Sequence, residues 1–222
     1  MNSGVVQLLV LAAVAIFLIL KLKNVLGTRD GFEKPALRDD PPAARAERRG
    51  ADLSVVEGGL DRDIVDHVKA GSPAADALAR MKAAEPSFTV VEFLSGAKGA
   101  YEMIVMAFER GDMESIRPFL APEVDATFTA AVEDRKAKGL TIEASFHGLR
   151  EMEVTDAEYD PATRMAEVTV RFVGELSSVV RDAKGEIIDG NKEEIRRQRD
   201  VWTFSRVMGS GNPNWTLTAT GE

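Results

Sequence analysis

Few side chains in this sequence have the types and the spacing that metal binding requires. The two histidines, His67 and His147, stand far apart, and neither has a second metal ligand at the spacing of a helix or a strand. The sequence contains no cysteine, so it forms no disulfide, thiolate zinc site, iron–sulfur cluster or thiol nucleophile. We therefore expect no bound metal or cofactor, and we interpret both histidines as surface or half-buried residues.

The sequence also lacks the common catalytic motifs, having no Gly-x-Ser-x-Gly elbow and no phosphate-binding loop. Gly209, Ser210 and Gly211 match part of a dinucleotide-binding loop, but Asn-Pro-Asn-Trp and a predicted strand follow them, which indicates a turn. Asp125 and Glu143 are the nearest candidates for a carboxylate base in a pocket. Alternation places Glu143 on a polar face, and nothing supplies an oxyanion donor beside Asp125. We predict that the protein is not an enzyme.

The balance of charge makes nucleic acid an unsuitable partner. The chain of 222 residues has a net charge of −8, whereas binding to a phosphate backbone requires a basic face. Arg196, Arg197 and Arg199 form a basic cluster, but acidic residues lie directly on both sides of it. We interpret this segment as a solvated strand.

An apolar run occupies residues 5–20, where Gln7 is the only polar residue. Insertion of its apolar side chains into a bilayer is favourable by about 4–7 kcal/mol, and residues 3–22 as a helix span about 30 Å. No basic residue precedes the run and no cleavage site follows it, so we predict a transmembrane anchor over residues 1–26 and not a signal peptide or a buried helix. The membrane-spanning side chains are Val5, Val6, Leu8, Leu9, Val10, Leu11, Val14, Ile16, Phe17, Leu18, Ile19 and Leu20.

Basic residues follow the run, among them Lys21 and Lys23, so the positive-inside rule places the C-terminal side in the cytoplasm. Prolines and charges of both signs then predict a flexible linker over residues 27–70, because such a segment buries too little apolar surface to order itself. Leu60, Ile64 and Val68 recur at helical spacing and predict a short, weak helix that ends at Gly71.

The next part of the chain has the apolar periodicity and the capping residues of helices. Ser72 and Pro73 begin a helix that extends to Glu85, and this helix either packs on the domain or lies on lipid. The helix with the strongest apolar periodicity is predicted over residues 89–110, with Gly111 ending it. Two further helices are predicted over residues 112–120 and 122–138.

After Gly139 the apolar period changes to two, which predicts strands. They cover residues 140–147, 152–159, 166–172, 201–207 and 215–220, with a bulge at Gly148 and a hairpin turn at residues 181–185. Helices followed by antiparallel strands predict an α+β fold, in which N-terminal helices pack on a curved four-stranded antiparallel sheet. Such a sheet encloses an apolar pocket, or a filled core, lined by Phe128, Phe146, Val168, Val170, Phe172, Trp202, Phe204, Trp215 and Leu217.

Several segments resemble the Tim44-like domain family, in the family's order, over about residues 71–222. They are residues 87–88 and 92–105, then 111–113, 120–124, 200–206 and 212–217. The apolar N-terminal segment followed by this domain resembles the bacterial TimA branch. The resemblance implies a nuclear transport factor two-like, or cystatin-like, cone without catalytic residues.

The resemblance also implies a function, because the mitochondrial relative is a scaffold of the inner-membrane import motor. That relative links the translocation channel to a DnaK-type chaperone and contacts unfolded polypeptide and anionic lipid. We therefore expect a single-pass adaptor in the bacterial inner membrane, with its N-terminus outside and its domain in the cytoplasm. Its expected partners are the lipid bilayer and a DnaK-type chaperone, a translocase or an unfolded client polypeptide. The alternatives are a pocket enzyme of the isomerase or hydratase type and, by analogy with a ribosomal relative, a ribosome-to-membrane tether.

Overall fold

The computed structural model describes residues 61–221, which belong to a compact unit running from Gly59 to Glu222. The predicted anchor over residues 1–26 and most of the predicted linker lie outside the described residues. Within residues 61–221, no helix combines the length and the apolar character needed to span a bilayer.

The helices begin and end at the capping residues that the sequence indicates. Ser72 Oγ accepts a hydrogen bond from the N–H of Ala75, and Thr89 Oγ1 accepts one from the N–H of Glu92. Gly111 ends the helix Val90–Arg110 with a φ of 74°, a left-handed conformation that glycine adopts without steric cost. The helices are α2 (Arg62–Val65), α3 (Pro73–Ala84), α4 (Val90–Arg110), α5 (Met113–Ile116), the 3-10 helix η1 (Arg117–Phe119) and α6 (Pro122–Ala137).

The sheet is antiparallel with the strand order β1-β2-β3-β4, which confirms the predicted four-stranded sheet. The two stretches predicted on either side of Gly148 form one long strand, β1, which continues through a register shift between Phe146 and Gly148. The predicted turn at residues 181–185 joins β2 to β3, and the N–H of Gly185 donates to the carbonyl of Asp182. The strands are β1 (Thr141–Asp160), β2 (Met165–Arg181), β3 (Ile187–Val207) and β4 (Thr216–Gly221).

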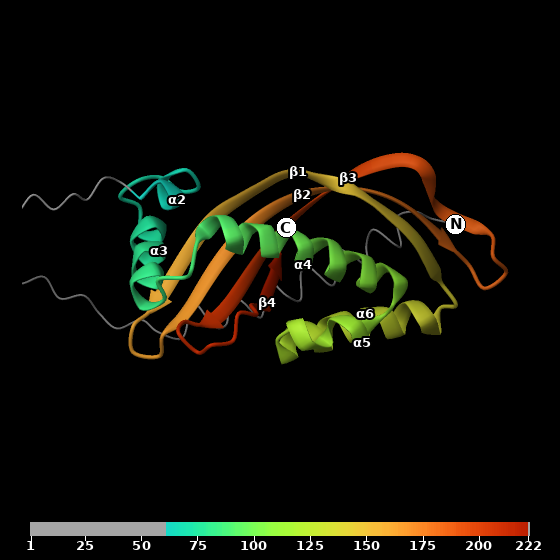
Figure 1. Ribbon diagram of the computed structural model, residues 1–222. Helices are drawn as coiled ribbons and strands as arrows, with labels where there is room; N and C mark the ends of the chain where they lie inside the picture. The colour runs from blue at the N-terminus through green and yellow to red at the C-terminus, as the bar shows by residue number, and fades with distance from the viewer. Residues whose placement is uncertain (1–60, 222) are drawn as a thin grey trace, which may run out of the picture. The chain divides into compact units, whose positions relative to one another are not determined.

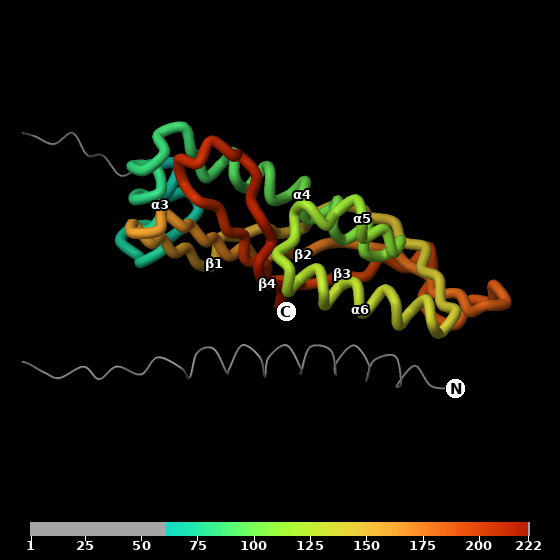
Figure 2. Tube along the Cα trace, turned by 90° about the horizontal axis from the view of Figure 1, so that it is seen from below, coloured from blue at the N-terminus to red at the C-terminus, as the bar shows by residue number. Residues whose placement is uncertain are grey.

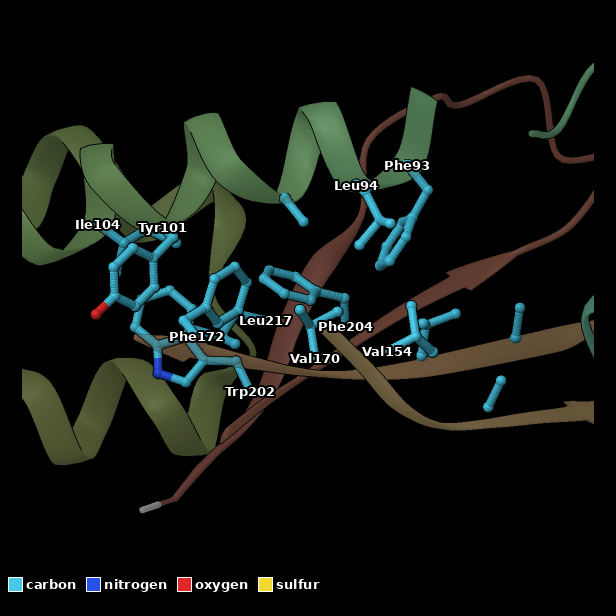
Figure 3. Packing of buried hydrophobic residues seen from close by; sticks show 14 of the residues in the cluster. Phe93, Leu94, Tyr101, Ile104, Val154, Val170, Phe172, Trp202, Phe204 and Leu217 are labelled. Carbon is cyan, nitrogen blue, oxygen red and sulfur yellow. The ribbon is translucent and has the colours of Figure 1, made fainter. Parts of the chain in front are cut away.

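The strands arch over α4, which lies along the concave side of the sheet (Figure 1). Between them lies the apolar core, in which Tyr101 from α4 meets Phe172 and Trp202 from the sheet (Figure 3). The ring centroids of Tyr101 and Phe172 are 4.5 Å apart and the rings are stacked. Burial of such large rings is the main driving force for packing the helix on the sheet.

The short helix α2 belongs to this domain rather than to a free linker. Ile64 is buried in the core, and the Asp63 carboxylate accepts hydrogen bonds from the N–H groups of Val90 and Val91 at the start of α4. Lys82 donates to the same carboxylate over 2.9 Å. The helix was predicted to extend to Gly71, whereas α2 is a single turn that ends at Val65. A helix of one turn is not stable by itself, so tertiary contacts must stabilise it.

Candidate functional site

A cleft of about 580 Å³ lies beside the first half of α4. The floor of the cleft is α4, and its wall includes Phe204 on β3 and the segment Pro213–Trp215 that leads into β4. Figure 2 shows this loop, in red, running beside the first turns of α4. A volume of this size lies within the range of ligand-binding pockets.

The floor of the cleft is formed by small residues on the exposed face of α4. The opposite face of the helix packs in the core through bulky side chains, among them Leu94 and Tyr101. Gly96 and Gly99 point the other way, and a Cβ added at either position would meet no atom within 4 Å. Together with Ser95 and Ala100 they leave the surface of the α4 backbone open to a ligand.

Aromatic side chains form the wall at one end of the cleft. The ring centroids of Phe93 and Trp215 are 4.7 Å apart, and those of Phe88 and Trp215 are 6.0 Å apart. At the other end lie Phe119, which is half-buried, and Met103, whose side chain is 38% exposed. The side chains that a ligand would touch are therefore mainly apolar.

An ion pair marks the aromatic end of the cleft. Arg206 Nη2 donates to Glu85 Oε1 over 2.8 Å, and Glu85 Oε2 accepts from the N–H of Gly209 over 2.7 Å. Burial by itself would raise the pKa of Glu85, but the hydrogen bonds from Gly209 and Arg206 outweigh it and hold this pKa below its usual value. The pair thus joins the end of α3 to the end of β3.

The guanidinium of Arg206 lies against the ring of Trp215, with Cζ 5.1 Å from the ring centroid. Its side chain is only 8% exposed, and Nε has no hydrogen-bond partner among the described residues. A buried N–H without an acceptor is unfavourable by about 1–3 kcal/mol. The Arg206 Nε–H is therefore a buried donor without an acceptor among the described residues.

Of the nine residues predicted to line a pocket, Phe204 and Trp215 line the cleft. Most of the others fill the space between α4 and the sheet, because their rings and branched side chains pack against one another on the inner face of the sheet. Val168, Val170, Phe172, Trp202 and Leu217 are buried in the core, whereas Phe146 packs near Tyr101 and Phe128 packs beside Phe108.

Sequence reasoning missed the residues that build the cleft, notably Phe88, Phe93 and Arg206. The available signal was the segment Ser95–Ala100, where small residues interrupt a helix that otherwise carries bulky side chains. Small residues on the exposed face of a helix allow a close approach by another backbone.

The carboxylates weighed as catalytic bases lie away from the cleft lining. Asp125 on α6 accepts hydrogen bonds from Arg117 Nε and Thr129 Oγ1. Glu143 is exposed on β1 and is paired with Arg181 and Lys192.

The histidines and the arginine cluster also lie at other places on the domain. His147 is within 2.9 Å of Ser177 Oγ, and residues 61–221 contain no group of three side chains able to hold a metal ion. Arg196 and Arg197 are paired with Glu194 and Glu175, and both arginines line a second, separate concavity.

A curved antiparallel sheet with helices on its concave side and an open apolar cleft defines the class: a small α+β domain with a ligand-sized groove. The chain belongs to the Tim44-like domain family, whose model matches residues 74–222. A crystal structure of the intermembrane space region of the chloroplast protein ARC6 is similar at 14% identity and a TM-score of 0.40. That similarity covers 58% of this chain and 94% of the ARC6 region. Among curated protein sequences, none matches this chain.

Proposed function

We propose that this protein is an adaptor that binds protein clients through the cleft beside α4. The observation that carries the proposal is the lining of the cleft, which combines aromatic walls with a floor of small residues. Burying apolar side chains of a client there is favourable by about 25 cal/mol for each Å² removed from water. Membership of the Tim44-like family supports a scaffold role connected with protein translocation.

The polar groups of the cleft favour binding over catalysis. Arg206 and Glu85 form an ion pair, and Glu85 also accepts a hydrogen bond from the N–H of Gly209, so both charges already have structural partners. General acid–base catalysis requires a titratable group in contact with the reacting atoms and supported by a second polar group. The engagement of Glu85 and Arg206 in structural contacts supports a binding role for the cleft.

The membrane part of the proposal rests on the sequence. The apolar run at residues 5–20 would anchor the protein in the bacterial inner membrane, and the basic residues that follow it would keep the domain in the cytoplasm. The proposed partners are a DnaK-type chaperone, a translocase subunit or an unfolded membrane-protein client, and the TimA branch remains our prediction. Extraction of membranes with alkaline carbonate tests the anchor: the full chain should stay in the pellet, and release of the full chain would refute the anchor.

Site-specific photocrosslinking tests the adaptor function in the full chain. A photoreactive residue replacing Met103, which lines the cleft, should crosslink to a chaperone, a translocase subunit or a membrane-protein client. The matched control is the same residue at Glu158, which is exposed on β1 away from the cleft. Equal crosslinking at both positions, or no protein partner at Met103, would refute client binding in the cleft.

A further inference from the structure

We propose that the cleft binds an apolar α-helix of about three turns that lies antiparallel to α4. This inference rests on the proposed function and specifies the form of the client. Three features of the cleft support it: the spacing and length of the small residues on its floor, the scarcity of backbone hydrogen-bond partners, and the exposed carboxylate at one end.

The floor has the shape that a helix requires. Gly96 and Ala100, and likewise Ser95 and Gly99, are four residues apart and therefore lie one turn above each other on the same face of α4. Pairs of small residues at this spacing let a second helix approach the backbone closely. The lining from Glu92 to Met103 spans about 16 Å along α4, which is the length of about three helical turns.

The lining of the cleft favours a helix over an extended segment. An extended peptide needs partners for its own N–H and C=O groups, whereas a helix satisfies them internally. Inside α4 the backbone groups of the floor are already bonded, and Thr89 Oγ1 accepts from the N–H of Glu92. The walls present the rings of Phe93 and Trp215, which accept apolar side chains but not main-chain groups.

The exposed carboxylate of Glu92, in the first turn of α4, sets the direction of the bound helix. The last turn of a helix presents carbonyl groups without an intrahelical partner, and basic side chains in that turn are favourable. Glu92 is an exposed carboxylate in the first turn of α4, and it lines the cleft. The C-terminal end of the client helix therefore lies at the N-terminal end of α4, with a Lys or Arg facing Glu92.

The test uses the full chain and two labelled peptides with the same pattern of Leu and Ala and a Lys in the last turn. One peptide is locked as a helix of about three turns by a hydrocarbon staple, and the other contains D-residues that prevent a helix. The locked peptide should bind at least about tenfold more tightly, measured by fluorescence anisotropy. Equal affinity of the two peptides would overturn the inference and leave client binding intact.

A double substitution blocks the floor without damaging the fold. In Gly96→Leu with Gly99→Leu, each new side chain points into open space and leucine favours a helix more than glycine does, so the melting temperature should not fall. Binding of the locked peptide should weaken at least about tenfold. The control is Glu102→Leu, an exposed position of α4 outside the cleft lining, which should bind as the wild type does. Unchanged binding by the double variant would also overturn the inference.

The chain contains no cysteine, so single cysteines report the direction directly. A cysteine in the last turn of the locked peptide should form a disulfide with Glu92→Cys and not with Met103→Cys, and the reverse pattern would refute the antiparallel arrangement. Failure of both peptides to bind, together with no partner crosslinked at Met103, would refute the proposed function as well.

Discussion

Tyr101 Oη donates a hydrogen bond to Asp200 Oδ2 over 2.6 Å, and this contact joins the middle of α4 to β3. The Tyr101 side chain is completely buried. Burial, followed by the nearby charge of Asp200 and the hydrogen bond to it, raises the pKa of the Tyr101 hydroxyl far above its usual range. The hydroxyl therefore stays protonated and holds α4, which forms the floor of the cleft, at a fixed height over the sheet.

Removing this hydroxyl should destabilise the domain. We expect Tyr101→Phe to lower the free energy of unfolding by about 1–3 kcal/mol, because the Asp200 carboxylate loses a charge-assisted hydrogen bond. Urea unfolding of the full chain, followed by circular dichroism, measures the effect. The control is Tyr159→Phe, at a tyrosine that is only partly buried, and it should change stability by less than about 0.5 kcal/mol. Equal effects of the two substitutions would contradict a special role for the Tyr101 contact.

The backbone of β2 leaves no room for a side chain below Tyr101. A Cβ added at Gly174 would lie 2.8 Å from Tyr101 Oη, so Gly174→Ala should displace the ring and lower stability by about 1–3 kcal/mol. Gly96→Ala is the matched control, because its new methyl group meets no atom and alanine favours the helix by about 1 kcal/mol. Thermal melts should therefore move in opposite directions, and a stabilising Gly174→Ala would refute this packing.

Glu85 should make the free energy of unfolding of the domain depend on pH. Its folded pKa lies below the usual value of 4.5, so its contribution is present above pH 4.5 and is lost as the pH falls through the lowered pKa. We expect Glu85→Gln to cost about 2–4 kcal/mol at pH 7, because it leaves the buried Arg206 without its counterion. The difference between wild type and variant, measured by urea unfolding, should shrink below pH 4. A difference that stays constant down to pH 3 would refute this contribution.

Asp63 should hold α2 against the start of α4. Burial by itself would raise the pKa of Asp63, but hydrogen bonds from Lys82 and from the N–H groups of Val90 and Val91 lower it. In Asp63→Asn the loss of charge weakens all three bonds, so amides in residues 61–68 should exchange with deuterium about tenfold faster or more. The exposed Asp66→Asn is the control. Unchanged exchange in the Asp63 variant would contradict this role of Asp63.

Local signals in the sequence predicted the secondary structure well, since each depends on neighbouring residues. Ser72, Thr89 and Asp112 accept hydrogen bonds from N–H groups of their own helices, so capping is readable without the fold. The inner residues of β2 alternate as predicted, with Val168, Val170 and Phe172 all buried. The position of α2 was not predictable in this way, because Asp63 bonds to residues 27 and 28 positions further along the chain.

The sequence by itself determined the α+β class, the four antiparallel strands and the membership of the Tim44-like family, because periodicity, caps and ordered motifs are properties of short segments. Only the tertiary structure decided where the cleft lies. Its walls bring Phe93 on α4 within 4.7 Å of Trp215 near β4, and its polar end joins Glu85 to Arg206. These residues are more than a hundred positions apart, and only the bending of the sheet over α4 brings them together.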